Sequence, residues 1–148
     1  MKTLVIMDMQ KEFIKDDELD EMQKYICNQI ENGKYDNIIN MVYINENGNG
    51  YSENIDSILK YSDKFKTIIK KQNDGSKELH RYFNDEIHLV GIRAKGCIAD
   101  TFIGLQKFRC NVIVHKNGID WVDNVKYKFP IVEDWNANYW ILIRYWLL

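Results

Sequence analysis

Short apolar runs separated by amphipathic stretches constrain the fold of this chain more than any other feature. The apolar runs are Leu4–Met7 and residues 38–44, 65–69, 88–92 and 111–115. The stretches with helical spacing of apolar side chains are 17–32, 52–62, 76–83 and 97–108. A continuous apolar run is typical of a strand buried on both faces, and strands that alternate with helices form a parallel sheet. We therefore expect a three-layer α/β/α, Rossmann-like fold with a mostly parallel central sheet of five to six strands.

The size and charge of the chain narrow the classes of protein to which it can belong. The 148 residues are 45% hydrophobic and 28% charged, which predicts a single domain over 1–148 with its own core. The net charge is −2 and the pI is about 5.9. A slightly acidic balance does not favour binding to nucleic acid or to an anionic membrane, both of which attract strongly basic proteins. We therefore expect neither partner.

Cysteine and histidine positions argue against disulfides and metal sites. The three cysteines are odd in number and lack C-x-x-C spacing, and the histidines His80, His88 and His115 do not form a ligand pattern. We therefore expect no metal and no cofactor. The first apolar run is too short for a signal peptide, and no segment approaches the roughly 18 apolar residues of a membrane span. These observations predict a cytoplasmic protein.

Three reactive side chains follow predicted strands. Asp8 follows the first strand, Lys70 and Lys71 follow the third, and Cys97 follows the fourth and opens an amphipathic helix. The carboxyl ends of parallel strands meet at one edge of a sheet, so these groups are expected to face the same rim. At a helix N-terminus, Cys97 would be stabilised as a thiolate, with its pKa lowered from about 8.5 towards ~3.5–7.5. A neighbouring carboxylate would take the thiol proton, and an ammonium would keep that carboxylate ionised.

The same segments resemble the isochorismatase-like cysteine hydrolases. The stretch 3–13, with Asp8, Gln10 and Phe13 in Asp-x-Gln-x-x-Phe order, is similar to the end of the family's first strand. The stretch Gly91–Ile98 resembles the family's nucleophile turn, and 68–71 resembles the end of its lysine strand. The resemblance covers roughly residues 3–115, in the family's order of Asp, Lys and Cys.

The resemblance implies a role for each matching residue. Asp8 would be the general base and later the acid, Cys97 the nucleophile, and Lys71 the orienting charge, with Lys70 as the other choice. Gln10 and Phe13 would shape the substrate pocket. Backbone N–H groups around Ala94 and Gly96 would bind the substrate oxyanion, and the peptide between Arg93 and Ala94 corresponds to one that is often cis in the family.

The chain also departs from the family pattern. It is shorter between the second strand and the lysine, and 44–51 lacks the Asp-x-His motif of metal-dependent nicotinamidases. Residues 72–76 replace the family's Ser-Ala-Phe-like pocket wall, and Ala94 stands where threonine is common. A nicotinamidase-type metal site is therefore not expected.

These observations together predict a cysteine hydrolase that cleaves a C–N bond of a small amide-type metabolite through a thioester. The alternative is a catalytically degenerate member that binds or sequesters a small molecule or a protein partner. A redox-sensing thiolate is a third interpretation, which lacks a resolving cysteine near Cys97 in sequence.

The C-terminal segment is strongly apolar. Residues 135–148 contain three tryptophans and many aliphatic side chains, with Arg144 as a late charge. The pattern fits a terminal strand, a helix or an exposed apolar surface. Such a surface is typical of a contact between copies of a chain, so we expect a homo-oligomer.

Overall fold

The computed structural model describes residues 1–45 and 47–120, and within them five parallel strands form one sheet. The strand order is β3-β2-β1-β4-β5. The strands are β1 (Lys2–Met7), β2 (Asn37–Tyr43), β3 (Lys66–Lys70), β4 (Glu86–Gly91) and β5 (Asn111–Ile119). The prediction of a three-layer α/β/α fold with a parallel sheet is confirmed.

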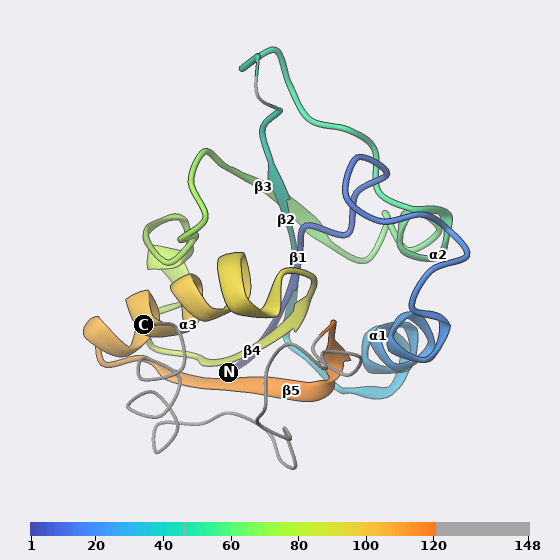
Figure 1. The fold of residues 1–148 in the computed structure, drawn as a ribbon. Helices are drawn as coiled ribbons and strands as arrows, with labels where there is room; N and C mark the ends of the chain where they lie inside the picture. The colour runs from blue at the N-terminus through green and yellow to red at the C-terminus, as the bar shows by residue number, and fades with distance from the viewer. Residues whose placement is uncertain (46, 121–148) are drawn as a thin grey trace.

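Helices cover both faces of this sheet (Figure 1), and each face has its own apolar core. On one side lie α1 (Asp20–Asn32) and α2 (Asp56–Leu59), over alternate strand residues such as Leu4 and Ile6. On the other lie α3 (Ala99–Lys107) and the 3₁₀ helix η1 (Lys77–Tyr82), over Val5 and Met7. Alternation of side chains along each buried strand produces these two cores from one apolar run.

Two predicted helices differ from the observed ones. The predicted helix 52–62 is a single turn, α2, although Ile55, Ile58 and Tyr61 all pack into the core. The predicted helix 97–108 begins earlier, as the π-helical turn η2 (Ala94–Ile98), and continues as α3. Cys97 therefore lies inside the turn rather than at a helix start.

The sheet reverses its direction of winding between β1 and β4. From β1 the chain crosses to β2 and then β3 on one side, and afterwards returns to β4 and β5 on the other. Ligands of open α/β sheets bind outside the carboxyl ends of the strands at such a switch point. The segments that follow β1 and β4 carry Asp8 and Cys97, so the topology brings both to this place.

Gly91 makes the close approach of β1 and β4 possible at this edge. Its φ is +129°, and a Cβ there would lie 2.1 Å from the carbonyl oxygen of Met7. A residue with a side chain therefore cannot occupy this position without moving β1 or β4.

The predictions made for 135–148 fall outside the described residues.

Candidate active site

Asp8, Lys70 and Cys97 meet in the interior at the carboxyl edge of the sheet. The side chains of all three are fully buried. The Lys70 Nζ lies 3.3 Å from Asp8 Oδ2, and Asp8 also interacts with the Cys97 thiol. The ammonium further donates to the carbonyls of Gln72 and Asn73, at 3.1 and 3.3 Å. Three residues that are distant in sequence thus form one ionisable cluster.

The lysine of this cluster is Lys70, so the preference for Lys71 is wrong. Side chains alternate along β3, and Lys70 faces the same side as Ile68, which packs against the α3-side core. Lys71 follows the strand and is exposed. The spacing of the apolar pair before the lysines does not reveal this, because a shift of one residue moves a side chain to the other face.

Left-handed backbone conformations occur at Asp8 and at Arg93, in the two segments that carry Asp8 and Cys97. Asp8 has φ 58° at the end of β1, and Arg93 has φ 65° before the π-helical turn. Such values are uncommon for residues other than glycine and persist where the surrounding structure imposes them. Among the described residues there is no cis peptide bond, so the expected cis peptide between Arg93 and Ala94 is not observed.

Burial controls the acidity of the carboxyl and the thiol. It raises the pKa of Asp8 above its ordinary value, while the Lys70 ammonium acts in the opposite direction. Burial, followed by the negative charge of Asp8, raises the pKa of Cys97. The expectation of a lowered cysteine pKa is therefore wrong, since removal from water outweighs the cationic neighbours.

Two polar side chains contact the sulfur of Cys97, and two aromatic rings pack against one of them. Arg93 Nη1 lies 3.7 Å from Sγ, and Asn73 Oδ1 lies 3.6 Å from it. The Arg93 guanidinium in turn lies over the ring of Phe13, 4.1 Å from its centroid, and 5.7 Å from that of Tyr43. Phe13, Tyr43 and Arg93 are half-buried, and Asn73 is exposed. Together these four side chains form one wall of the site, beside the fully buried sulfur.

Of the two residues predicted to shape the pocket, Phe13 belongs to this wall and Gln10 supports it. The Gln10 side chain is fully buried. Its Oε1 accepts from the Tyr43 N–H at 2.7 Å, and its Nε2 donates to the Tyr43 carbonyl at 3.1 Å. Gln10 therefore holds the end of β2 and positions the Tyr43 ring.

The N–H groups predicted to bind an oxyanion already have partners. The Ala94 N–H donates to Asp120 Oδ1 at 2.8 Å, and the Gly96 N–H donates to the Arg93 carbonyl at 2.9 Å. Asp120 Oδ2 also accepts from the Arg93 N–H at 3.0 Å. The sequence did not suggest Asp120, which lies directly after β5 and holds the turn that carries Cys97.

A second polar cluster lies on the opposite face of the sheet, under α1. The His88 Nδ1 lies 2.6 Å from the His115 Nε2, and His115 Nδ1 lies 2.6 Å from the Tyr25 hydroxyl. The His88 Nε2 lies 3.1 Å from Glu86 Oε2. Neighbouring strands β4 and β5 bring these histidines together, which their spacing in the sequence does not indicate. Among residues 1–45 and 47–120, no group of three or more histidine, cysteine or acidic side chains is arranged to hold a metal ion.

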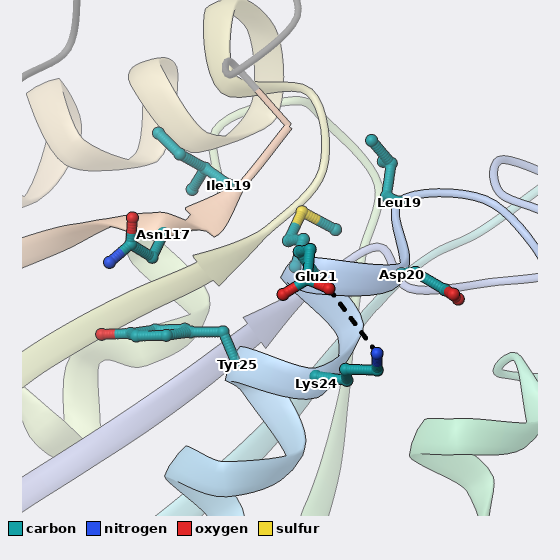
Figure 2. Close-up of a pocket in the computed structure, with 8 residues that line it drawn as sticks. Leu19, Asp20, Glu21, Lys24, Tyr25, Asn117 and Ile119 are labelled. Atoms are coloured by element: carbon teal, nitrogen blue, oxygen red, sulfur yellow. Dashed lines mark ion pairs between the residues drawn. The ribbon is translucent and has the colours of Figure 1, made fainter.

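A separate cavity of about 740 Å³ lies between the beginning of α1 and the end of β5. Figure 2 shows its lining, in which Leu19 and Ile119 lie opposite the Tyr25 ring and Glu21 pairs with Lys24. None of Asp8, Lys70 and Cys97 lines it. The cavity is therefore separate from the ionisable cluster.

Within the described chain, no helix is both long enough and apolar enough to cross a bilayer.

Comparison with known proteins shows the fold. No protein family and no curated sequence matches the chain. Among solved structures, the nicotinamidase of Staphylococcus aureus is 19% identical in sequence to this chain. The match covers 80% of this chain and 83% of the nicotinamidase chain, with a TM-score of 0.66. The N-carbamoylsarcosine amidase of Thermoplasma acidophilum is 18% identical over 84% of this chain and 91% of its own, with a TM-score of 0.64. An isochorismatase-like hydrolase of Alkaliphilus metalliredigens is 16% identical over 80% of each chain, with a TM-score of 0.62.

Proposed function

From the isochorismatase-like α/β fold that these comparisons show, we propose that the protein is a cysteine hydrolase that cleaves the C–N bond of a small amide. The observation that carries the proposal is the fully buried ion pair of Asp8 and Lys70 beside the Cys97 sulfur. Burying a carboxylate and an ammonium costs several kcal/mol per ion, which their attraction offsets only in part. An arrangement of this kind is typical of a catalytic site rather than of a stabilising contact.

The state of the Asp8 carboxylate supports its role as a proton acceptor. Neither of its oxygens receives a hydrogen bond of good geometry from the described residues, although Lys70 lies within ion-pair distance. A buried carboxylate with unused acceptor capacity and a raised pKa accepts a proton readily. Because the pKa of Cys97 is also raised, the thiol proton would pass to Asp8 as the sulfur attacks, without a stable thiolate beforehand.

The proposed reaction has two stages, acylation of Cys97 and hydrolysis of the resulting thioester. Sγ forms a bond to the amide carbonyl carbon while Asp8 takes the thiol proton, and the carbonyl electron pair moves to oxygen. The C–N bond then breaks, Asp8 returns the proton to the leaving amine, and a thioester remains. Water attacks the thioester while Asp8 takes its proton, the C–S bond breaks as Asp8 returns that proton to the sulfur, and the products are the carboxylic acid and the free thiol. Lys70 would hold Asp8 in place and offset its charge.

The N–H groups of Ala94 and Gly96 could bind the oxyanion only after a change in their hydrogen-bond partners. Their N–H groups would have to exchange Asp120 and the Arg93 carbonyl for the substrate oxygen when the substrate binds. The exchange would take place in the π-helical turn, and π-turns inside helices are frequent at functional sites.

The test is ammonia release from a panel of primary amides. We expect Cys97→Ala to lower the rate by at least about 10³-fold, because the covalent route is lost. Cys27→Ala, which removes a half-buried thiol on α1, is the matched control and should retain the wild-type rate. Equal turnover by wild type and Cys97→Ala would contradict the thioester mechanism.

The alternative function, binding without turnover, is favoured by one observation. The Cys97 sulfur is fully enclosed, so a substrate reaches it only when the surrounding side chains move. If no amide releases ammonia while a small molecule of the same panel raises the melting temperature of the protein, the binding function replaces the hydrolase.

A further inference from the structure

Arg93 has a position that the hydrolytic scheme leaves unused. Its side chain is half-buried, and Nη1 of the guanidinium lies 3.7 Å from the Cys97 sulfur. Phe13 and Tyr43 pack against the guanidinium, and these two rings meet edge to face with centroids 6.2 Å apart. A molecule bonded to the sulfur would therefore lie within reach of this guanidinium.

The position of Arg93 is imposed by its backbone. Arg93 adopts the left-handed conformation, its N–H donates to Asp120, and its carbonyl accepts from the N–H groups of Gly96 and Ile98. These bonds hold the backbone while the side chain extends over Phe13. A guanidinium held in this way loses little entropy when it binds a ligand.

No ion pair joins the Arg93 guanidinium to an acidic side chain of the described residues, although its positive charge acts on Asp8 against the rise in the pKa of that carboxyl. Asp120 contacts Arg93, but it accepts from the backbone N–H. The ion pairs of the described chain involve other cations, and Lys70 takes Asp8. The aromatic faces attract the guanidinium weakly compared with a carboxylate. The guanidinium therefore retains donors for an anionic partner.

We propose that Arg93 recognises a carboxylate on the substrate, so that the amide cleaved here carries an anionic group close to the scissile carbonyl. The guanidinium fork matches a carboxylate with two parallel hydrogen bonds. Because Nη1 lies 3.7 Å from Sγ, a carbonyl carbon bonded to the sulfur would lie close to this guanidinium, so only a short chain separates it from that carboxylate. The substrate class is thus a short-chain acid amide. This inference rests on the proposed function for the reaction, but its test does not require turnover.

The test compares alkylation of Cys97 by iodoacetate and by iodoacetamide. In both reactions the thiolate sulfur bonds to the reagent carbon and iodide leaves with the C–I electron pair, and the reagents differ in a carboxylate against a neutral amide. The ratio of the two rates at one pH cancels the thiolate fraction and the opening of the site. Peptide mass spectrometry follows each cysteine separately, and Cys27 in the same molecule serves as the reference.

We expect the iodoacetate-to-iodoacetamide ratio at Cys97 to exceed that at Cys27 by about tenfold, as one charge-assisted contact implies. Arg93→Gln should lower the Cys97 ratio to the Cys27 value, and Arg93→Lys should retain part of it. Lys95→Gln is the matched control, because it removes a positive charge from the same turn at an exposed position. It should leave the ratio unchanged, and the Cys27 ratio reports that each variant is folded.

Three results would overturn the proposal: an unchanged ratio in Arg93→Gln, an equal loss in Lys95→Gln, or no alkylation of Cys97 by either reagent. Failure of the hydrolase function is recognised separately, as absence of ammonia release from the acid amides while the Arg93-dependent ratio persists. If turnover is found, Arg93→Gln should raise KM for a carboxylate-bearing amide and leave a neutral amide unaffected.

Discussion

At the scale of single residues, the environment of each ionisable group decides what it can do. Lysines 70 and 71 are adjacent and chemically identical, yet one is fully buried in an ion pair and the other is exposed. Cys27, Cys97 and Cys110 are all free thiols, and of these three only Cys97 lies beside a fully buried ion pair, that of Asp8 and Lys70. The chemistry follows from neighbours that come from other strands.

The lysine pair offers a prediction with a built-in control. Lys70→Met should lower amide hydrolysis by about 10²-fold or more, because Asp8 loses the charge that holds it ionised. Lys71→Met should keep the wild-type rate, since its side chain is exposed. Steady-state ammonia release measures both, and equal losses in the two variants would contradict the assignment of Lys70.

The acidity of Cys97 yields a pH prediction. Burial raises the pKa of the thiol above its ordinary value of 9.0, so the thiolate is scarce near neutral pH. The rate of Cys97 alkylation by iodoacetamide should therefore keep rising with pH beyond 9.0. Mass spectrometry of the modified peptide over a pH series measures this midpoint. A plateau already reached near pH 7 would instead indicate a stabilised thiolate.

At the scale of elements, strand ends and the turns after them build the site. β1 is followed by Asp8, whose backbone conformation is left-handed. β3 ends at Lys70, and β4 leads through Gly91 into the π-helical turn. The strands were placed by their apolar runs within one or two residues of the observed bounds, except that β5 extends to Ile119. The π-helical form of the turn was not anticipated, because the five residues Ala94–Ile98 are too few to show an apolar period of their own.

Gly91 is the element-scale position most sensitive to change. Gly91→Ala should lower the free energy of unfolding by about 3 kcal/mol or more, because its Cβ would meet the Met7 carbonyl at 2.1 Å and its φ is positive. Urea unfolding followed by circular dichroism measures the loss. Gly96→Ala is the control, since its Cβ would meet only Arg93 Cβ at 3.6 Å, and we expect a change below about 1 kcal/mol. Similar losses in both variants would contradict this explanation.

At the scale of the whole molecule, the switch point of the sheet assembles the candidate site. Figure 1 shows β1 and β4 side by side at the centre, with α3 on one face and α1 on the other. The segments after β1, β3 and β4 therefore converge although they are far apart in the sequence. The polar side-chain clusters around Cys97 and around His88 belong to opposite faces of the sheet.

Association between copies is a prediction of the sequence that belongs to this scale. The apolar character of 135–148 predicts a homo-oligomer, since water disfavours large exposed apolar surface. Light scattering coupled to size exclusion should give a mass at least twice that of the 17.7 kDa chain. A mass of one chain over a range of concentrations would show the prediction to be wrong.

The sequence alone determined the class of fold and two of the three cluster residues. Fully apolar runs specify buried parallel strands, and reactive residues in the segments after such runs, Asp8 and Cys97, come to the carboxyl edge in any right-handed α/β winding. The tertiary structure decided the rest: that Lys70 faces inward, that burial keeps Cys97 protonated, and that Arg93 and Asp120 surround its turn. These outcomes depend on strand parity, on removal from water and on contacts between distant segments, which no local pattern records.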